Sequence, residues 1–312
     1  SELSKRFGPQ AEAFFVFNGS AANVLSLASF VRPFEAVLTA DCAHLQNDEC
    51  GAFERFTGAK IFTVPAVQGK ISPKSLEGLL ALRGNVHASL EQHLALRGNV
   101  HASQPRAVTI TQTTECGTLY TWNEIKTLAD FAHAHEMILH VDGSRFSNAL
   151  AALNSKPADV AALGIDVLSF GGTKNGLMLG EAVVFFNQAR AVKDFPYIRK
   201  QSLQLASKMR FIGAQFLAYL ENDLYLENAR HANAMAKRLY SGIREIPGVE
   251  LAFPPEANAL FVKLRPDTMA ELQKEFYFYL WDSQSSVARW MCSFETTPQQ
   301  VDTLIEAVRR LA

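Results

Sequence analysis

The chain has 312 residues, of which 48 % are hydrophobic and 20 % are charged, and its formal net charge is −1. This composition is ordinary for a globular protein with a real core, and the length fits one large domain plus a smaller one. The near-neutral charge argues against a nucleic-acid partner, and no apolar run reaches the about 18 residues of a membrane span.

The cysteines also restrict the class of protein. Cys42, Cys50, Cys116 and Cys292 lie far apart in the sequence and form no CxxC pair, so neither a metal site nor a disulfide is predicted. The first residues show no signal-peptide pattern. We therefore expect a cytoplasmic protein without a bound metal.

The sequence contains one tandem duplication. Residues 75–88 and 89–102 form two consecutive blocks that differ only at positions 78/92 and 79/93. Repeat folds need about three or more units, so a single extra copy does not indicate a solenoid. We expect it to lengthen a surface connection, where insertions are tolerated.

The first two thirds of the chain alternate between strand and helix patterns. Residues 1–13 resemble the end of a helix, residues 14–17 are an apolar run, and residues 18–22 form a turn that opens a helix. Small residues at a helix start can seat a phosphate, although an ordinary N-cap at Asn18 or Ser20 explains the turn equally well. This alternation predicts an α/β fold with a mostly parallel sheet, in which residues 181–186 lie at an edge or run antiparallel. The other expected strands are 35–39, 60–64, 106–111, 137–141 and 167–170, and a capped helix follows Thr121.

The last third of the chain has a different pattern. A long helical region is expected from about 194 to 239, and a smaller α+β unit follows it. We divide the chain into a large domain, 1–212, and a small C-terminal domain, 213–312. The strands expected in the small unit are 249–253, 259–264, 276–281 and 289–294, and Thr297 and Pro298 start the last helix.

A single lysine follows one of the expected strands. Lys174 comes after the strand 167–170 and the turn formed by Gly171 and Gly172. Open α/β sheets place their ligands at the carboxyl ends of strands, and glycines let the backbone approach a ligand closely. An amine in this place can form a Schiff base with a carbonyl cofactor, although a surface lysine in a glycine turn would have the same pattern.

Other residues near expected strand ends match what pyridoxal 5′-phosphate (PLP) requires. This cofactor needs a lysine, a carboxylate against its ring nitrogen, a phosphate seat and a partner for its ring. An amino-acid substrate needs an arginine for its carboxylate. The sequence therefore predicts a PLP site for an amino acid, built from Lys174, Asp142, residues 18–22, His44, Arg145 and Arg289.

Two motifs resemble those of a known family. The segments 140–149 (HVDGSRFSNA) and 168–176 (LSFGGTKNG) are similar to the matching motifs of low-specificity threonine aldolases, especially the phenylserine-aldolase-like branch. The resemblance extends from Phe17 to Ser293 and is looser in the small domain. It implies a fold-type I PLP enzyme that cleaves L-β-hydroxy-α-amino acids, such as threonine or phenylserine, to glycine and an aldehyde.

The resemblance also implies how the cofactor is bound. Lys174 forms the Schiff base with the cofactor aldehyde, and Asp142 pairs with the pyridine nitrogen. His44 stacks on the ring and lies near the β-hydroxyl of the substrate. The residues implied around the phosphate are Asn18, Gly19, Ser20 and Ala21.

For the substrate, the resemblance implies Arg145 and Arg289 as ligands of the carboxylate. His101 matches a second active-site histidine that assists with the hydroxyl, and we prefer it to its duplicate, His87. Fold-type I sites form between subunits, so a homodimer or homotetramer is implied. Two basic residues resemble those that reach the phosphate of a neighbouring subunit, namely Lys200 and Arg210.

Several alternatives stay open at this point. The base for the β-hydroxyl could be His44, His101 or a water between them. β-Elimination or transamination would use the same Lys174 and Asp142. The family also has a Ser-Asp-Asn-like motif upstream of the position that matches Ser1, and a protein without that segment could bind the cofactor without turnover.

Overall fold

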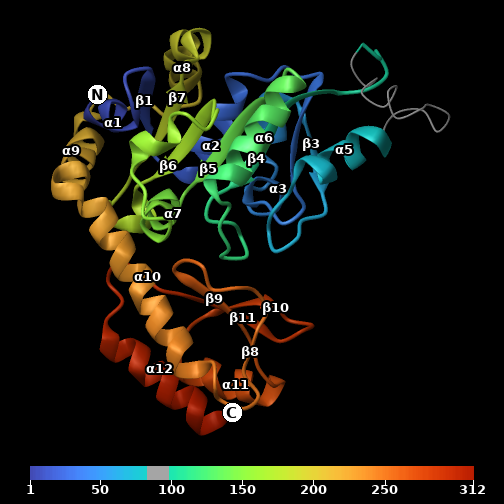
Figure 1. Cartoon of the computed structure of the whole chain (residues 1–312). Coiled ribbons are helices and arrows are strands. Elements are labelled where there is room, and N and C mark those ends of the chain that lie inside the picture. The colour runs from blue at the N-terminus through green and yellow to red at the C-terminus, as the bar shows by residue number, and fades with distance from the viewer. Residues whose placement is uncertain (83–97) are drawn as a thin grey trace.

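The computed structural model describes residues 1–82 and 98–312, which form two lobes (Figure 1). Each lobe is built on a β-sheet of its own. The long helix α10 (Leu224–Ile243) runs from the larger lobe into the smaller one, where it packs beside the last helix, α12 (Pro298–Leu311). The N-terminus lies in the large lobe and the C-terminus in the small lobe.

The sheet of the large lobe is parallel except for one strand. Its strands are β1 (Ala11–Val16), β2 (Glu35–Ala40), β3 (Lys60–Val64), β4 (Gln104–Thr111), β5 (Ile138–Gly143), β6 (Val167–Gly171) and β7 (Glu181–Phe186). Their order is β1-β7-β6-β5-β4-β2-β3, and β7 is antiparallel to both of its neighbours. The predicted mostly parallel α/β sheet is therefore confirmed, and residues 181–186 form the antiparallel strand inside it.

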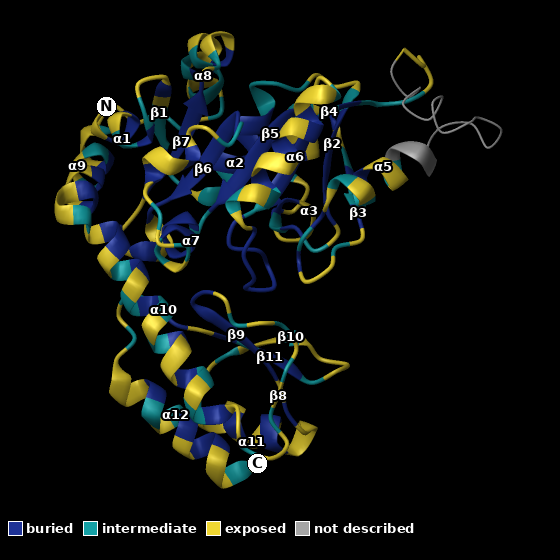
Figure 2. Cartoon of the chain, in the orientation of Figure 1, coloured by how far each residue is buried: buried dark blue, intermediate teal, exposed yellow. Residues whose placement is uncertain are grey.

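Helices cover both faces of this sheet because successive strand residues enter two separate cores. Val37 and Val167 belong to the core under α2, α4 and α8, whereas Leu38 and Leu168 belong to the core under α1, α6 and α9. Figure 2 shows the strands as the buried centre of the lobe and the helices exposed on their outer sides. The helices are α1 (Glu2–Phe7), α2 (Gly19–Ala28), α3 (His44–Asn47), α4 (Ala52–Thr57), α5 (Pro73–Leu82), α6 (Trp122–Ala134), α7 (Phe146–Ala152), α8 (Ala189–Gln201) and α9 (Arg210–Leu220), with 3₁₀ turns at Pro157–Val160, Thr173–Asn175 and Glu221–Asp223.

The small lobe is an antiparallel sheet packed on helices. It contains β8 (Glu250–Leu251), β9 (Ala259–Lys263), β10 (Tyr279–Asp282), β11 (Val287–Met291) and α11 (Pro266–Glu275). The strand order is β10-β11-β9-β8. Leu260 and Trp290 pack against α10 and α12 in a core of their own, and Thr297 starts α12 with a capping box. The small α+β unit expected from the sequence thus has its own sheet and core.

Two expected helices differ from the observed ones. The helix expected over 1–13 ends at α1, and the chain pairs with β7 from Ala11 onward because tertiary pairing outweighs local pattern. The long helical region is divided into α8, α9 and α10. Leu203, Asn222 and Asp223 have left-handed φ angles of 62°, 51° and 58°, which a continuous helix cannot contain.

Part of the duplication lies outside the described residues. Residues 83–97, which include His87 and most of the second block, belong to that part. Among the helices of residues 1–82 and 98–312, none is long and apolar enough to cross a membrane.

Candidate active site

The predicted site residues gather at the carboxyl edge of the large sheet. His44 follows β2, Asp142 is in β5 and Arg145 follows it, and Lys174 lies in the 3₁₀ turn after β6. These strands are parallel, so their carboxyl ends meet at one edge. Their charges act on one another across this edge, because Arg145 and Asp142 both change the pKa of Lys174. The fold therefore brings together residues that are up to 130 positions apart (174 − 44).

Asp142 is a buried carboxylate held by two hydrogen bonds. It is 7 % exposed. Its Oδ1 accepts a hydrogen bond from the backbone N–H of Ser144 at 3.0 Å, and its Oδ2 accepts one from Nδ2 of Asn23 at 2.9 Å. Each carboxylate oxygen can accept more than one hydrogen bond, so Asp142 can still accept one from a protonated ring nitrogen.

His44 is held by a carboxylate from its own loop. Nδ1 of His44 lies 2.9 Å from Oε1 of Glu49, in the turn between α3 and α4. This hydrogen bond is the main reason that the pKa of His44 is raised, and the charges of Glu115 and Asp142 add to it. The imidazole is thus oriented through one nitrogen.

Lys174 extends from a turn that is anchored on both sides. The backbone N–H of Gly172 donates to Oε2 of Glu181 at 2.7 Å, and Nδ2 of Asn175 donates to the hydroxyl of Tyr219 at 2.6 Å. The lysine residue is exposed, yet desolvation lowers the pKa of its amine, and the charge of Arg145 lowers it further. A lowered pKa favours the neutral amine that attacks a carbonyl group.

Two arginines from different lobes face the same space. Arg145 follows β5 of the large lobe and Arg289 is in β11 of the small lobe. Desolvation and the charge of Arg289 lower the pKa of Arg145 to about 10. Nε of Arg289 is buried without a hydrogen-bond partner among the described residues. Two guanidinium groups whose charges act on each other, one of them with an unpaired buried Nε, are suited to bind a carboxylate.

Glu115 lies among these charges. It is 9 % exposed and comes from the loop after β4. Figure 2 shows this loop as buried although it extends beyond the sheet toward the small lobe, where the N–H of Leu119 donates to Oε2 of Glu256 at 2.6 Å. Desolvation raises the pKa of Glu115, Asp142 raises it further, and Arg145 opposes this shift.

The start of α2 borders a separate small cavity of about 170 Å³. The side chain of Asn18 caps the helix by accepting from the N–H of Ala21 at 2.8 Å. A Cβ atom at Gly19 would meet nothing within 4 Å, so the N-terminal backbone faces open space. A helix N-terminus with accessible N–H groups is suited to an anion. The residues of the cavity that matter here are Asn18, Ser20, Ala21, Ser202 and Gln204.

These features fit PLP. A lysine with a lowered pKa could receive the aldehyde, and a buried carboxylate with spare acceptor capacity could pair with the ring nitrogen. The open N-terminus of α2 could receive the phosphate. The groups concerned are the side chains of Lys174, Asp142 and His44 and the backbone of residues 18–21.

Three predicted residues do not join this cluster in the chain described. His101 is exposed and precedes β4, whereas the site lies where the strands end, so the structure places it at the opposite edge of the sheet. Lys200 in α8 and Arg210 at the start of α9 are also exposed. Nothing within this single chain joins these two residues to the cluster, and a role across a subunit boundary stays a prediction.

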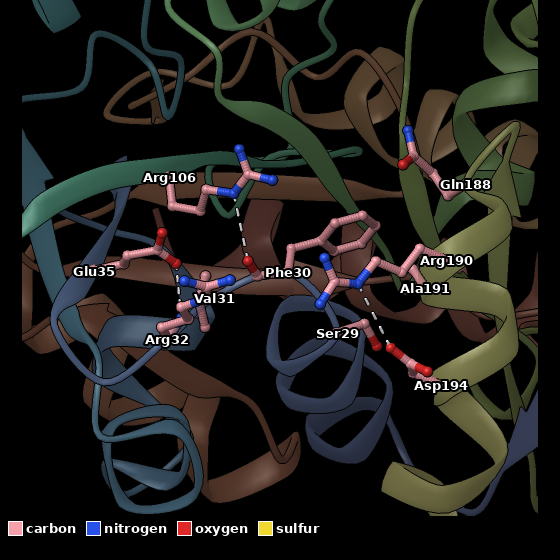
Figure 3. Close-up of a pocket in the computed structure, with 10 residues that line it drawn as sticks. All are labelled: Ser29, Phe30, Val31, Arg32, Glu35, Arg106, Gln188, Arg190, Ala191 and Asp194. Atoms are coloured by element: carbon pink, nitrogen blue, oxygen red, sulfur yellow. Dashed lines mark hydrogen bonds and ion pairs between the residues drawn. The ribbon is translucent and has the colours of Figure 1, made fainter.

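A larger cavity of about 470 Å³ is separate from the site (Figure 3). Glu35 at the start of β2, Arg106 near the start of β4 and Gln188 after β7 line it. It therefore lies at the edge opposite to that of Lys174, and none of the predicted residues lines it. We place the chemistry at the carboxyl edge because the titratable groups gather there.

Sequence reasoning missed Asn23, Glu49, Glu115 and Glu181. Each is buried and polar. Glu49 follows α3, Glu115 follows β4 and Glu181 begins β7. Such a position at the end of an element is a weak signal of function. Their partners are distant in sequence, because Asn23 bonds to Asp142 across 119 positions, so only the fold reveals them.

Comparison with known proteins agrees with this geometry. The family model of beta-eliminating lyases matches residues 1–266. The chain is 41 % identical over 307 residues to a low specificity L-threonine aldolase of Pseudomonas sp. (strain NCIMB 10558), covering 98 % of this chain and 84 % of that protein. It is 40 % identical over 306 residues to that of Pseudomonas aeruginosa, with 97 % and 84 % covered.

A solved structure gives the same result. The structure of a threonine aldolase of Leishmania major matches with a TM-score of 0.87 and 30 % identity, covering 99 % of this chain and 86 % of that one. This match confirms the fold-type I architecture. Enzymes of this group depend on PLP, the cofactor that the clustered residues fit. The chain belongs to the beta-eliminating lyase family and is similar to its threonine aldolases.

Proposed function

We propose that this chain is a PLP-dependent carbon–carbon lyase that cleaves L-β-hydroxy-α-amino acids of the threonine type to glycine and an aldehyde. Its similarity to low specificity L-threonine aldolases over nearly the whole chain supports this activity. The observation that carries the proposal is the cluster itself. A lysine of lowered pKa, a buried carboxylate and Arg145 lie at one edge of the large sheet, and the charge of Arg289 acts on Arg145 from the small lobe.

The residues around the cofactor would act as follows. When bound, PLP supplies an electron sink for the electrons of the broken Cα–Cβ bond. Asp142 would keep a proton at the ring nitrogen, because a buried carboxylate stabilises a facing cation. Lys174 would hold the cofactor between turnovers and accept a proton at its amine when the substrate amine replaces it. The first turn of α2, residues 18–21, would hold the phosphate.

The arginines would orient the substrate. Arg145 and Arg289 would bind its carboxylate, which fixes the direction of the bonds at Cα. Because the two residues come from different lobes, a bound carboxylate links the lobes. Water is then excluded from the reacting bond by the loop after β4 and by the small lobe.

His44 is the base that the geometry favours for the β-hydroxyl proton. Its Nδ1 is occupied by Glu49, so Nε2 is the free nitrogen. Proton removal from the hydroxyl lets the aldehyde form as Cα–Cβ breaks. The exposed position of His101 argues against its sharing this step.

Several finer properties also belong to the proposal. We propose phenylserine-type substrates beside threonine and a cytoplasmic location, consistent with four free cysteines. We propose two domains, as the separate second core supports, although the boundary expected between 212 and 213 precedes the change of core. Phe216 of α9 packs in the large core, so the change of core falls somewhat later, within α10.

We further propose that the chain forms a homodimer or homotetramer. Exposed apolar side chains favour an interface around α9, because Phe211 and Leu217 are each 59 % exposed and Met178 is 91 % exposed. Gln215 of α9 accepts from the N–H of Met178 at 2.9 Å, so these residues are neighbours. Lys200 and Arg210 would then approach the phosphate of a partner.

The purified protein tests the activity directly. We expect a visible absorbance band from the bound cofactor that shifts on addition of L-threonine or L-phenylserine, together with aldehyde and glycine in equal amounts. A keto acid and ammonia in their place would indicate β-elimination. A band without any product would indicate a protein that binds the cofactor without turnover.

Replacement of Lys174 tests the site. Lys174→Ala should abolish both the band and glycine formation, because no amine remains to hold the cofactor. Lys193→Ala, an exposed lysine of α8, is the matched control and should leave both unchanged. Full activity of Lys174→Ala would contradict the assignment.

A further inference from the structure

Glu49 is a buried carboxylate that contacts the proposed base, His44. It is 6 % exposed and lies in the turn between α3 and α4. The residues that follow it, Cys50 and Gly51, have left-handed φ angles of 53° and 67° and reverse the chain. This turn places the carboxylate of Glu49 beside the imidazole of His44.

One oxygen of Glu49 accepts two hydrogen bonds. Oε1 lies 2.9 Å from Nδ1 of His44 and 2.9 Å from Nδ2 of Asn23. The same Nδ2 also donates to Oδ2 of Asp142 at 2.9 Å. Asn23 therefore lies between two buried carboxylates and donates one proton to each. His44, Glu49, Asn23 and Asp142 form one hydrogen-bonded chain.

The direction of the first bond in this chain follows from the atoms. A carboxylate oxygen only accepts, so the proton between Glu49 and His44 belongs to Nδ1 of the imidazole. In the neutral ring, Nε2 is then the nitrogen without a proton. Only in this tautomer is Nε2, the nitrogen that does not contact Glu49, the one that can accept a proton.

We propose that Glu49 is a positioning residue that holds His44 in its Nδ1–H tautomer and, through Asn23, fixes the imidazole relative to Asp142. The inference rests on the proposed function only in one respect, namely that Nε2 of His44 takes the proton of the β-hydroxyl. The hydrogen-bonded chain itself needs neither cofactor nor substrate. The second carboxylate oxygen of Glu49, Oε2, is buried without a hydrogen-bond partner among the described residues. Both hydrogen bonds of the carboxylate are therefore made by Oε1.

Two other carboxylates also act on His44. Glu115, from the loop after β4, and Asp142, from β5, each favour the charged imidazole. A change of charge alone therefore cannot identify the role of Glu49. The tautomer can, because within residues 1–82 and 98–312 Glu49 is the hydrogen-bond partner of Nδ1.

The experiment is ¹⁵N NMR of the ring nitrogens in the full chain after removal of the cofactor, with the His44 signals assigned by a His44→Gln variant. In Glu49→Gln, the amide oxygen still accepts both bonds, so we expect the Nδ1–H tautomer to persist while the pKa of His44 falls because the negative charge is lost. In Glu49→Ala, we expect both the tautomer preference and the raised pKa to be lost. Asp48→Ala, the exposed neighbour, should change neither.

Kinetics of the PLP-loaded variants provide a second measurement. We expect Glu49→Gln to retain kcat within about 10-fold and Glu49→Ala to lose about 100-fold, because misplacing a catalytic group costs about this much. KM should change little, since the arginines bind the carboxylate. If Glu49→Ala does not fold, Glu49→Leu, which fills a similar volume and accepts no hydrogen bond, replaces it in both measurements, with the same loss of the Nδ1–H tautomer expected.

A wild-type tautomer in Glu49→Ala, or an unchanged pKa in Glu49→Gln, would overturn the inference and leave the aldolase activity untouched. Conversely, a protein that makes no glycine would overturn the proposed function, and the NMR result would still stand.

Discussion

At the scale of single residues, the site is a set of charges whose proton affinities depend on burial. Desolvation is the largest cause of the shifts at Lys174, Arg145 and Glu115, whereas a hydrogen bond is the largest at His44. Burial thus favours the neutral amine and the neutral carboxyl group before any substrate is present. The free energy of folding of the packed sheet below the site offsets the cost of desolvating these groups.

The raised pKa of Glu115 predicts a pH effect on stability. Its proton is bound more strongly in the folded state, so its contribution to stability is fully present below the unfolded-state pKa and is lost as pH rises through the folded-state pKa. Glu115→Gln should therefore raise the Tm of the cofactor-free protein at pH 8 and leave it nearly unchanged near pH 4. Thermal unfolding at several pH values measures this difference.

The control for this prediction is Glu12→Gln, an exposed carboxylate of β1. It should leave Tm unchanged at both pH values, because its carboxylate is in contact with water in the folded chain as well as in the unfolded one. A Tm difference in Glu115→Gln that is the same at pH 4 and pH 8 would show that burial of the charge is not its cause.

At the scale of elements, close backbone contacts position the site. A Cβ atom at Gly171, at the end of β6, would lie 2.2 Å from the carbonyl oxygen of Ser144, which follows β5. Strand β6 therefore touches the segment that carries Arg145. The distance between Lys174 and Arg145 therefore depends on the absence of a side chain at Gly171.

Gly171→Ala tests this contact. Overpacking a closed contact costs about 1–3 kcal/mol of unfolding free energy, and we expect that loss together with a raised KM for the amino acid because Arg145 is displaced. Denaturant unfolding and steady-state kinetics measure the two effects.

Gly213→Ala in α9 is the matched control. Its Cβ would have Phe15 Cε2 as its nearest neighbour at 3.7 Å, an ordinary contact. Because alanine favours a helix over glycine by about 0.5–1 kcal/mol, this variant should be as stable as the parent or more so. A Gly171→Ala variant that behaves in the same way would contradict the close contact.

The sequence predicts elements well where local pattern and tertiary packing agree. The runs 60–64 and 106–111 are β-branched and apolar, and they became β3 and β4. The sequence predicts the bounds of helices and strands poorly where tertiary packing outweighs the local pattern. Residues 11–13 joined β1 because β7 offers them partners, and Leu203 interrupts a helical pattern that has no glycine or proline at that point.

The same distinction explains the site. Lys174 and Asp142 could be predicted because each follows a strand within a specific motif. Glu49 and Asn23 could not, since their roles depend on hydrogen bonds that form only after β1, β2 and β5 are in place. His101 was expected from its motif, but the start and the end of β4 lie at opposite edges of the sheet.

At the scale of the whole molecule, association of two subunits would bring Lys200 and Arg210 of one chain to the site of the other. If Lys200 and Arg210 act across a subunit boundary, an inactive Lys174→Ala chain and an inactive Lys200→Ala/Arg210→Ala chain should complement each other. Random pairing at equal amounts gives one intact site in half of the dimers, so about a quarter of the wild-type activity should return.

Co-expression of the two variants measures this activity, and each variant expressed alone is the control. Co-expression of Lys174→Ala with His44→Ala is a second control. Both residues lie in the cluster of one chain, so this mixture should recover no activity. A site that draws all its residues from one chain would recover no activity in either mixture.

The position of the two arginines on separate lobes has one further consequence. Arg145 and Arg289 repel each other until an anion lies between them. The carboxylate that neutralises them is the part that all α-amino acids share, and the side chain that leaves as aldehyde contributes nothing to this neutralisation. Recognition is thus concentrated on the invariant end of the substrate, which leaves the choice of aldehyde to the shape of the remaining space.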